Sequence, residues 1–491
     1  MFGNITPEKA GITSKKVLEF LKTIDAANLT THSVIMAKGN DIFAESYYKP
    51  FHKDYLHRMY SVSKSFIAIA AGLAYTEGLL TLEDKVMDYF PELKESNPNE
   101  FAEEVTIRDM LTMSNNCCGY IPWYQNCESR LLAYFSEKVE NKLPGTLFFY
   151  DSIGSYVLNC IVEKLTGKEF LEYLKEKVLL EIGFSKESYT LYAPGGYTIG
   201  DSGVMCTSRD LLLFTRFIAQ YGEWNGKQYI DREFMKQAVT KQIHSNIING
   251  VNYHGSHGYG YLIWCMPDDG FALIGMGDQL AIYDRKTDFT FIITSDNQAD
   301  SATARPIIFH DVYKTLIHNI GKDELPENRD DYALLEEYMN NRTLVHQSGR
   351  YDSSLSEEIN SVTYTLSENP MNISSFNIKL EKDSGIFSFE KNGTKYELPF
   401  GMGKNIFGKF PENRRQLLSM GDIGEGHYEC ATSAAWVMEN HFVIKSQIID
   451  TYFGCLNIHF VFKDDKVQLL MKKSGQYILD GFDGYANGKK A

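Results

Sequence analysis

The chain has 491 residues, of which 43% are hydrophobic and 23% are charged, and its formal net charge is −15. A chain of this length exceeds what one hydrophobic core usually organises, so two domains are expected. The acidic balance argues against nucleic acid or a membrane surface as a partner, because both attract a basic face.

Residues 1–9 contain neither the basic nor the apolar segment of a signal peptide. The chain has no run of about 18 apolar residues, so no membrane-spanning helix is predicted. Its eight cysteines form no Cys-x-x-Cys pair, which favours free thiols in a reducing compartment. Cys117, Cys118 and Cys127 lie close together, but no histidine or second cysteine pair follows at ligand spacing. We therefore expect a cytoplasmic protein without a metal or another cofactor.

The chain opens with mixed helix and strand signals. Residues 14–28 place apolar side chains at helical spacing, with Ser14 as the expected cap. Residues 32–38 and 42–47 flank Gly39-Asn40-Asp41, which predicts a β-hairpin.

The next segment carries the main candidate for chemistry. Tyr60-Ser61-Val62-Ser63-Lys64 precedes an apolar run that ends near Gly78, which is typical of a helix with a glycine at its C-terminal cap. Ser61 and Lys64 would lie one turn apart on one face. A lysine buried behind such a helix has a lowered pKa and can take the proton of a serine hydroxyl. The alternative is a serine that caps the helix, followed by a solvated lysine.

The same four-residue pattern occurs at two other places. Ser46 and Lys49 run into Pro50, and Ser388 and Lys391 lie in an alternating, strand-like segment. Neither pair is followed by a helix, so neither is expected to be catalytic.

Downstream, residues 106–114 read as a capped helix start that leads into a loop. Trp123 and Tyr124 in that loop either line a pocket or cover the core. Tyr150 then precedes a helix over residues 153–166. A phenol beside a lysine ammonium would have a lowered pKa and could relay the serine proton, and the alternative for Tyr150 is a packed aromatic.

The remaining pattern separates two parts of the chain. Helices are predicted over 169–178, 211–221 and 304–317, and strands over 258–264, 271–284 and 289–295, as an antiparallel sheet with terminal helices packed on it. Residues 321–331 are polar and charged, and short alternating strands follow from about 348. We expect a hydrolase-type domain over 1–320, a linker over 321–347, and an all-β barrel or sandwich over 348–491.

These landmarks, in this order, resemble the serine β-lactamase and penicillin-binding-protein-like hydrolases, closest to the class C β-lactamase-related esterases and amidases. The resemblance covers roughly residues 10–320. It rests on residues 60–64, 80–84, 106–112, Pro144-Gly145 before Tyr150, 203–210 and 275–279. It implies an α/β (α+β) fold in which helices flank an antiparallel sheet beside an all-helical lobe.

In enzymes that look like this, the serine attacks a carbonyl and water cleaves the resulting acyl-enzyme. The resemblance makes Ser61 the nucleophile, gives the proton transfers to Lys64 and Tyr150, and forms the oxyanion hole from the backbone N–H groups of Ser61 and Met276. Ser152 stands where the family usually has asparagine.

The third motif departs from the family more strongly. Its first residue is usually lysine or histidine, and here Leu273 takes that place, or Met276 if the register is shifted. Gly275 belongs to the same motif, and Asp278 stands where a small residue is common. Together with Ser152, Trp123 and Tyr124, the residues Leu273 and Gly275 are expected to contact the substrate.

Without a cation to hold a substrate carboxylate, an uncharged ester or amide fits better than a β-lactam or a D-Ala-D-Ala peptide. The substrate class expected is a small-molecule ester, amide or peptide. The expected function is therefore a serine acyl hydrolase acting on a small molecule. The alternatives are a β-lactamase or D-Ala-type peptidase, and a binding or scaffold protein that kept the fold. The C-terminal domain could shape the active-site mouth, support a homo-oligomer, or stabilise the chain.

Overall fold

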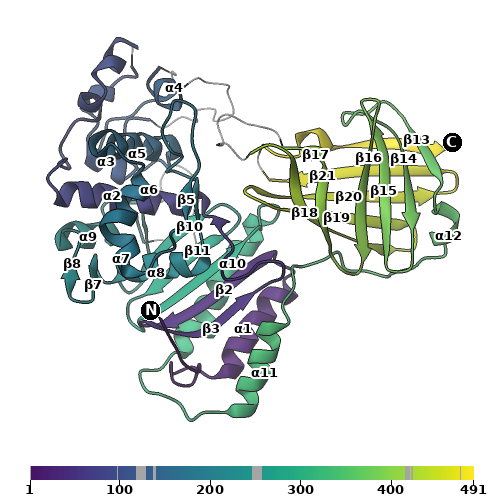
Figure 1. Ribbon diagram of the computed structural model, residues 1–491, viewed down its shortest axis with the longest axis horizontal. Helices are drawn as coiled ribbons and strands as arrows, with labels where there is room; N and C mark the ends of the chain where they lie inside the picture. The colour runs from purple at the N-terminus through teal and green to yellow at the C-terminus, as the bar shows by residue number, and fades with distance from the viewer. Residues whose placement is uncertain are drawn as a thin grey trace. The chain divides into compact units, whose positions relative to one another are not determined.

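The computed structural model describes residues 2–96, 98–117, 129–136, 140–245, 257–414, 421, 424–475 and 477–491. Internal contacts divide the chain into two compact units. Unit 1 comprises Met1–Thr343 with Leu417–Asp422, and unit 2 comprises Leu344–Gln416 with Ile423–Ala491 (Figure 1).

The centre of unit 1 is a sheet with the strand order β1-β3-β2-β12-β11-β10-β9. All neighbours are antiparallel except β1 and β3. The predicted N-terminal hairpin is confirmed, and its first strand pairs with a strand from far along the chain. The strands are β1 Gly3–Asn4, β2 Thr31–Lys38, β3 Asp41–Tyr47, β9 Trp264–Cys265, β10 Phe271–Gly275, β11 Gln279–Asp284 and β12 Phe289–Ser295.

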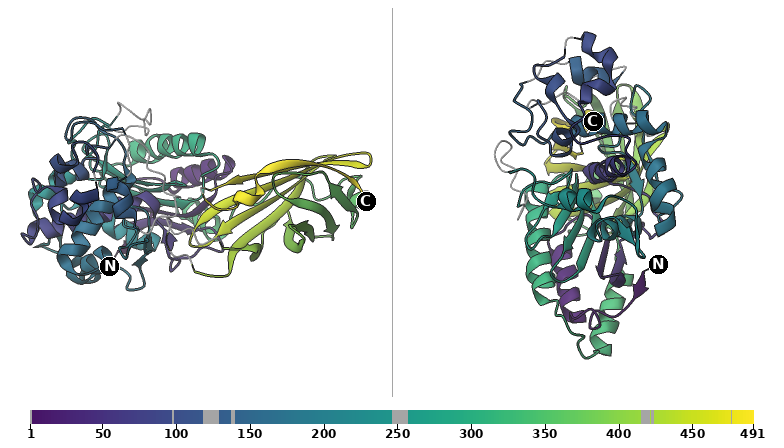
Figure 2. Two further views of the ribbon diagram at one scale, coloured as in Figure 1. Left: turned by 90° about the horizontal axis from the view of Figure 1, so that it is seen from above. Right: turned by 90° about the vertical axis from the view of Figure 1, so that its left-hand side faces the viewer.

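Helices cover both faces of this sheet. Phe20 of α1 (Ser14–Ala26) packs edge-on against Phe291 of β12, with ring centroids 5.3 Å apart. On the opposite face, Ser208 of α8 (Ser208–Ala219) reaches Ser33 of β2, with their hydroxyls 2.6 Å apart. Helix α11 (Arg329–Asn340) runs beside α1 (Figure 1), and Figure 2 shows the same ribbon from two further sides. The sheet is thus enclosed, as its almost continuously apolar strands require.

A helical lobe surrounds α2 (Ser63–Thr76), which is buried from Ser63 through Ala74. A helix that is apolar all round belongs inside a protein, and Gly72 lets the ring of Phe234 approach it closely. The other helices of unit 1 are α3 Ile107–Leu111, α4 Arg130–Ser136, α5 Ser152–Thr166, α6 Phe170–Leu174, α7 Leu180–Ile182, α9 Arg232–Val239 and α10 Ser301–Asp311. Short strands complete the unit, namely β4 His57–Arg58, β5 Tyr189–Thr190, β6 Val204–Cys206, β7 Glu223–Trp224 and β8 Lys227–Gln228.

Several local expectations need correction. Thr13, not Ser14, caps α1, because its side chain accepts from the N–H of Lys16. The stretch 271–284 is not one strand but the hairpin β10–β11, since Gly277 and Asp278 turn the chain in left-handed conformations. Only Trp264 within 258–264 belongs to a strand. The stretch 321–347 contains α11, whose Leu335 is buried in the core of unit 1.

Unit 2 is built from strands, as predicted, and its sheet closes into a barrel because β16 also pairs with β18. Ring contacts among Phe376, Phe387 and Phe460 fill part of its interior. Its strands are β13 Thr363–Leu366, β14 Ile373–Leu380, β15 Ser384–Lys391, β16 Thr394–Met402, β17 Ile406–Asn413, β18 His427–Met438, β19 His441–Ile449, β20 Phe453–Lys463, β21 Lys466–Ser474 and β22 Gly484–Lys490. A short helix, α12, covers Ser356–Ile359.

Among the described residues, no helix has both the length and the apolar character needed to cross a bilayer.

Candidate active site

Ser61 lies in a short 3-10 turn, η1 (Tyr60–Val62), that leads directly into α2. The preceding residues are fixed by pairing of β4 with β6 and by the hydrogen bond from Met59 N–H to the carbonyl of Val204, 2.9 Å long. Tyr60 has a φ of 46°, a left-handed conformation that is uncommon for a bulky residue and clusters at functional sites. The Ser61 side chain is partly exposed and can be reached from solvent.

Lys64 lies one turn further on, and its side chain is only 1% exposed. Its Nζ is 3.0 Å from Ser61 Oγ and donates to the backbone carbonyl of Asp201 at 2.8 Å. Burial lowers the pKa of Lys64 to about 8, with Asp201 and Asp151 opposing the shift and Arg130 adding to it. A substantial fraction of Lys64 is therefore a neutral amine at mildly alkaline pH, as a general base requires.

Tyr150 lies near Ser61 and Lys64, with its ring stacked on Trp264 at a centroid distance of 5.9 Å. Lys64 Nζ is 5.3 Å from the centre of the Tyr150 ring. Burial raises the pKa of Tyr150 to about 12, although a hydrogen bond with Ser61 and the charge of Arg305 act in the opposite direction. The expectation of a lowered pKa is therefore wrong, because desolvation outweighs nearby cations. Tyr150 is protonated near neutral pH and can donate a hydrogen bond.

Strand β10 ends beside the Ser61 turn. A Cβ atom on Gly275 would lie 2.5 Å from the Met59 carbonyl oxygen, so only glycine allows this approach. Met276 follows immediately and is partly exposed. The backbone of Met276 therefore lies close to the Ser61 turn.

Two ion pairs with fully buried carboxylates frame this region, and the sequence predicted neither of them. Arg130 and Asp201 approach to 3.3 Å with side chains 3% and 0% exposed, and the Arg130 guanidinium lies 4.4 Å from the centre of the Tyr156 ring. Arg305 Nε donates to Asp278 Oδ1 at 2.8 Å. A buried charge requires a partner, but the sequence gives no sign of which one.

A sequence model of the Beta-lactamase family matches residues 22–310, which is more than half of the chain. The chain belongs to the beta-lactamase family. The predicted resemblance to serine hydrolases of the β-lactamase and penicillin-binding-protein type is confirmed.

Two curated relatives of this beta-lactamase-family protein match part of its length. Penicillin-binding protein 4* of Bacillus subtilis is 25% identical over 190 residues, 35% of this chain and 41% of the relative. The 6-aminohexanoate-dimer hydrolase of Paenarthrobacter ureafaciens is 22% identical over 225 residues, 43% of this chain and 57% of the relative. The chain therefore spans about half the length of these relatives.

One solved structure resembles this family member over nearly its whole length. The octameric penicillin-binding protein homologue from Pyrococcus abyssi has a TM-score of 0.51 at 17% identity, and the match covers 97% of this chain and 99% of the homologue. At this identity the likeness shows a shared fold.

The residues of this beta-lactamase-family protein that were expected to contact substrate differ in their exposure. Ser152 begins α5 and is partly exposed, while the preceding Asp151 caps the helix. The side chain of Leu273 is fully buried in the core, so it does not line an opening to solvent. Trp123 and Tyr124 lie outside the described residues, as do Cys118 and Cys127. Within the described ranges, no three His, Cys, Asp or Glu side chains are grouped to bind a metal ion.

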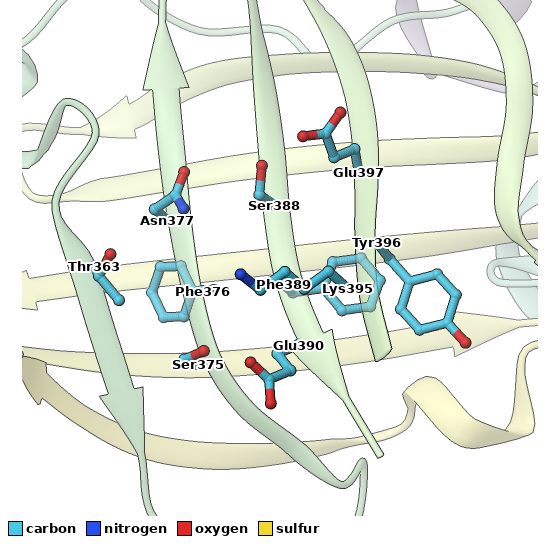
Figure 3. Close-up of a pocket in the computed structure, with 10 residues that line it drawn as sticks. All are labelled: Thr363, Ser375, Phe376, Asn377, Ser388, Phe389, Glu390, Lys395, Tyr396 and Glu397. Carbon is cyan, nitrogen blue, oxygen red and sulfur yellow. The ribbon is translucent and has the colours of Figure 1, made fainter. Parts of the chain in front are cut away.

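The other two Ser-x-x-Lys patterns are not built as sites. Ser46 Oγ donates to the carbonyl of Met339 at 3.0 Å, while Lys49 is exposed. Ser388 lines a polar groove of about 320 Å³ on β13–β16, next to Asn377 on the neighbouring strand (Figure 3). Lys391 is buried and paired with Glu412. Residues three apart in a strand point to opposite faces, so Lys391 cannot reach Ser388.

Proposed function

We propose that this protein is a serine acyl hydrolase that cleaves an uncharged ester or amide through an acyl-enzyme on Ser61. The observation that supports this best is the 3.0 Å contact between Ser61 Oγ and the buried Lys64 Nζ, whose pKa is lowered to about 8. A serine hydroxyl becomes an effective nucleophile when such a base takes its proton.

In the proposed first step, Ser61 Oγ attacks the substrate carbonyl carbon as its proton passes to the neutral amine of Lys64. The carbonyl oxygen gains negative charge and accepts hydrogen bonds from the N–H groups of Ser61 and Met276. The bond to the leaving group then breaks, and Tyr150 gives its proton to that group. Lys64 returns a proton to Tyr150, so the charges balance. Water repeats the sequence on the acyl-enzyme and releases the acid.

The charges near the site favour a neutral substrate. Leu273 and Met276 supply no cation at the third motif, and the guanidinium of Arg305 is already paired with Asp278. Among the described residues of the third motif, none therefore offers a cation to a substrate carboxylate, which would lose its hydration there without compensation. Cytoplasmic location, self-association and the role of unit 2 stay predictions from the sequence.

The test is intact mass after incubation with a fluorophosphonate, together with turnover of p-nitrophenyl acetate and butyrate. Ser61→Ala is compared with Ser388→Ala, which removes the serine of a Ser-x-x-Lys pattern in unit 2. One adduct and ester turnover are expected in the wild type and in Ser388→Ala, and neither in Ser61→Ala. A folded wild type that forms no adduct and turns over no ester would contradict the proposal and favour a scaffold role.

A further inference from the structure

The turn between β10 and β11 contains a charged side chain in an unusual setting. Asp278 has a φ of 68° and is fully buried. Its carboxylate accepts from Arg305 Nε of α10 at 2.8 Å and from Asn297 Nδ2 at 3.2 Å. Glycine would adopt this backbone conformation more easily, so the side chain is expected to have a role of its own.

Arg305 reaches both ends of this turn. Besides Asp278, its Nη2 donates to the carbonyl of Gly275 at 3.5 Å, and the N–H of Asp278 donates to the same oxygen at 3.2 Å. Gly275 is in turn pressed against the Met59 carbonyl, next to the Ser61 turn. Arg305 thus ties together the two residues that flank Met276 and Gly277.

We infer that the Asp278–Arg305 ion pair is a positioning device for the Met276 N–H. The inference rests on the proposed function, because it assigns that N–H to the oxyanion hole. An oxyanion donor stabilises the transition state only when it is held within about 0.5 Å of its productive position. Arg305 supplies that rigidity with two contacts, Nε to the buried Asp278 carboxylate and Nη2 to the Gly275 carbonyl, and a buried carboxylate cannot leave its cationic partner cheaply.

Strand β11, which follows the Asp278 turn, offers a matched control at its other end. Asp288 in the β11–β12 turn has a φ of 55° and pairs with Arg216 of α8 at 2.6 Å. This carboxylate is 48% exposed, against 0% for Asp278. The six residues of β11 separate the two turns by about 20 Å. Both pairs fasten a β-turn to a helix, but only the Asp278 pair borders Met276.

The experiment compares wild type, Asp278→Asn, Arg305→Gln, Arg305→Lys, the double variant Asp278→Asn/Arg305→Gln, and Asp288→Asn. It measures kcat and KM for p-nitrophenyl butyrate, the Ki of a phenylboronic acid that forms a tetrahedral adduct, the pH profile and Tm. We expect Asp278→Asn to lower kcat by about 10²-fold, with a parallel loss of boronate affinity and little change in KM. The kcat of the double variant should be no lower than that of the more impaired single variant, because both substitutions disrupt the same ion pair.

Arg305→Lys should keep more activity than Arg305→Gln, and the fall in rate below about pH 8 should stay in place, because Lys64 is untouched. Asp288→Asn should stay within about two-fold of wild type in kcat. Should Asp278→Asn fail to fold, Asp278→Gly removes the carboxylate while accepting the same backbone conformation. Equal effects of the two aspartate substitutions, or a fall in kcat at unchanged boronate affinity, would overturn the inference. An inactive wild type would instead overturn the proposed function.

Discussion

Units 1 and 2 fill their interiors with different kinds of side chain. Unit 1 buries several charged residues, each no more than 3% exposed, and they gather around the Ser61 turn: Arg58, Lys64, Arg130, Asp201 and Asp278. The interior of unit 2 is mainly aromatic, with Phe376, Phe442, Phe460 and Trp436 fully buried. Burying a charge costs free energy, so a fold keeps such groups together where they serve a purpose. The contrast places the candidate chemistry in unit 1.

The largest expected effect comes from Lys64, the charge closest to Ser61. Lys64→Met should lower kcat/KM by about 10³–10⁴-fold, because it removes the base. In the wild type, the rate should rise about tenfold per pH unit below a pKa of about 8 and level off above it, since only the neutral amine accepts a proton. Steady-state kinetics between pH 6 and 10 measure both effects.

Lys175→Met is the matched control, because Lys175 is also a buried lysine of unit 1. Its Nζ donates to the Glu172 carboxylate at 2.7 Å and to the carbonyls of Lys186 at 2.8 Å and Ser188 at 2.9 Å, rather than to Ser61. This variant should lose stability but keep kcat. An equal loss of activity in both variants would contradict the special role of Lys64.

The next effect belongs to the aromatic interior of unit 2. Phe460 is fully buried and contacts Phe376 and Phe387 at centroid distances of 5.0 and 5.3 Å. Phe460→Ala should destabilise unit 2 by about 3–5 kcal/mol through lost burial and a cavity, without changing kcat of unit 1. Denaturant unfolding, followed by far-UV circular dichroism and by ester turnover, separates the two units.

Tyr485→Ala serves as the control, because its side chain is 66% exposed and the change should cost less than about 0.5 kcal/mol. A parallel loss of activity and barrel stability in Phe460→Ala would show that the two interiors are not independent.

The smallest effect concerns a histidine pair in each unit. His32 Nδ1 and His57 Nε2 of unit 1 lie 2.8 Å apart, both fully buried, and burial lowers both pKa values, that of His57 to about 3. Both rings are therefore neutral in the folded protein. The unfolded chain binds protons below about pH 6.5, so stability is intact above that pH and falls as the pH drops towards the folded pKa, by about 1.4 kcal/mol per unit for each ring.

His441 and His459 of unit 2 provide the comparison, because their rings are 3.0 Å apart but only partly buried, and burial lowers their pKa values less. His57→Asn should flatten the pH dependence of the unfolding free energy between pH 6.5 and 4.5, whereas His441→Asn should change it little. Equal slopes in the two variants would contradict the assignment to the unit 1 pair.

The helices and strands that were predicted correctly depend mainly on short-range sequence patterns. The apolar run after Ser61, the Gly-Asn turn near residue 40 and the Thr106 cap all act within a few residues, so their elements could be placed from sequence. Together with the family resemblance, they also brought Ser61, Lys64 and Tyr150 to one site. The strand β22 was not predicted, because its Gly-rich sequence gains strand structure only from pairing with β13 and β21.

Effects that depend on tertiary structure could not be predicted. Arg305 meets Asp278 across 27 residues, and no spacing rule connects a helix residue to a turn that far away. The pKa of Tyr150 was predicted in the wrong direction, because the neighbouring lysine is visible in the sequence while the depth of burial is not.

The close contact between Gly275 and the Met59 carbonyl limits how this site can evolve. Any side chain at position 275 would push β10 away from the Ser61 turn, so substitution of this residue cannot be used to adjust the site. Ser152 and Met276 are partly exposed and tolerate other side chains more readily. A library designed to change the substrate range should therefore vary these two positions and leave the glycine fixed.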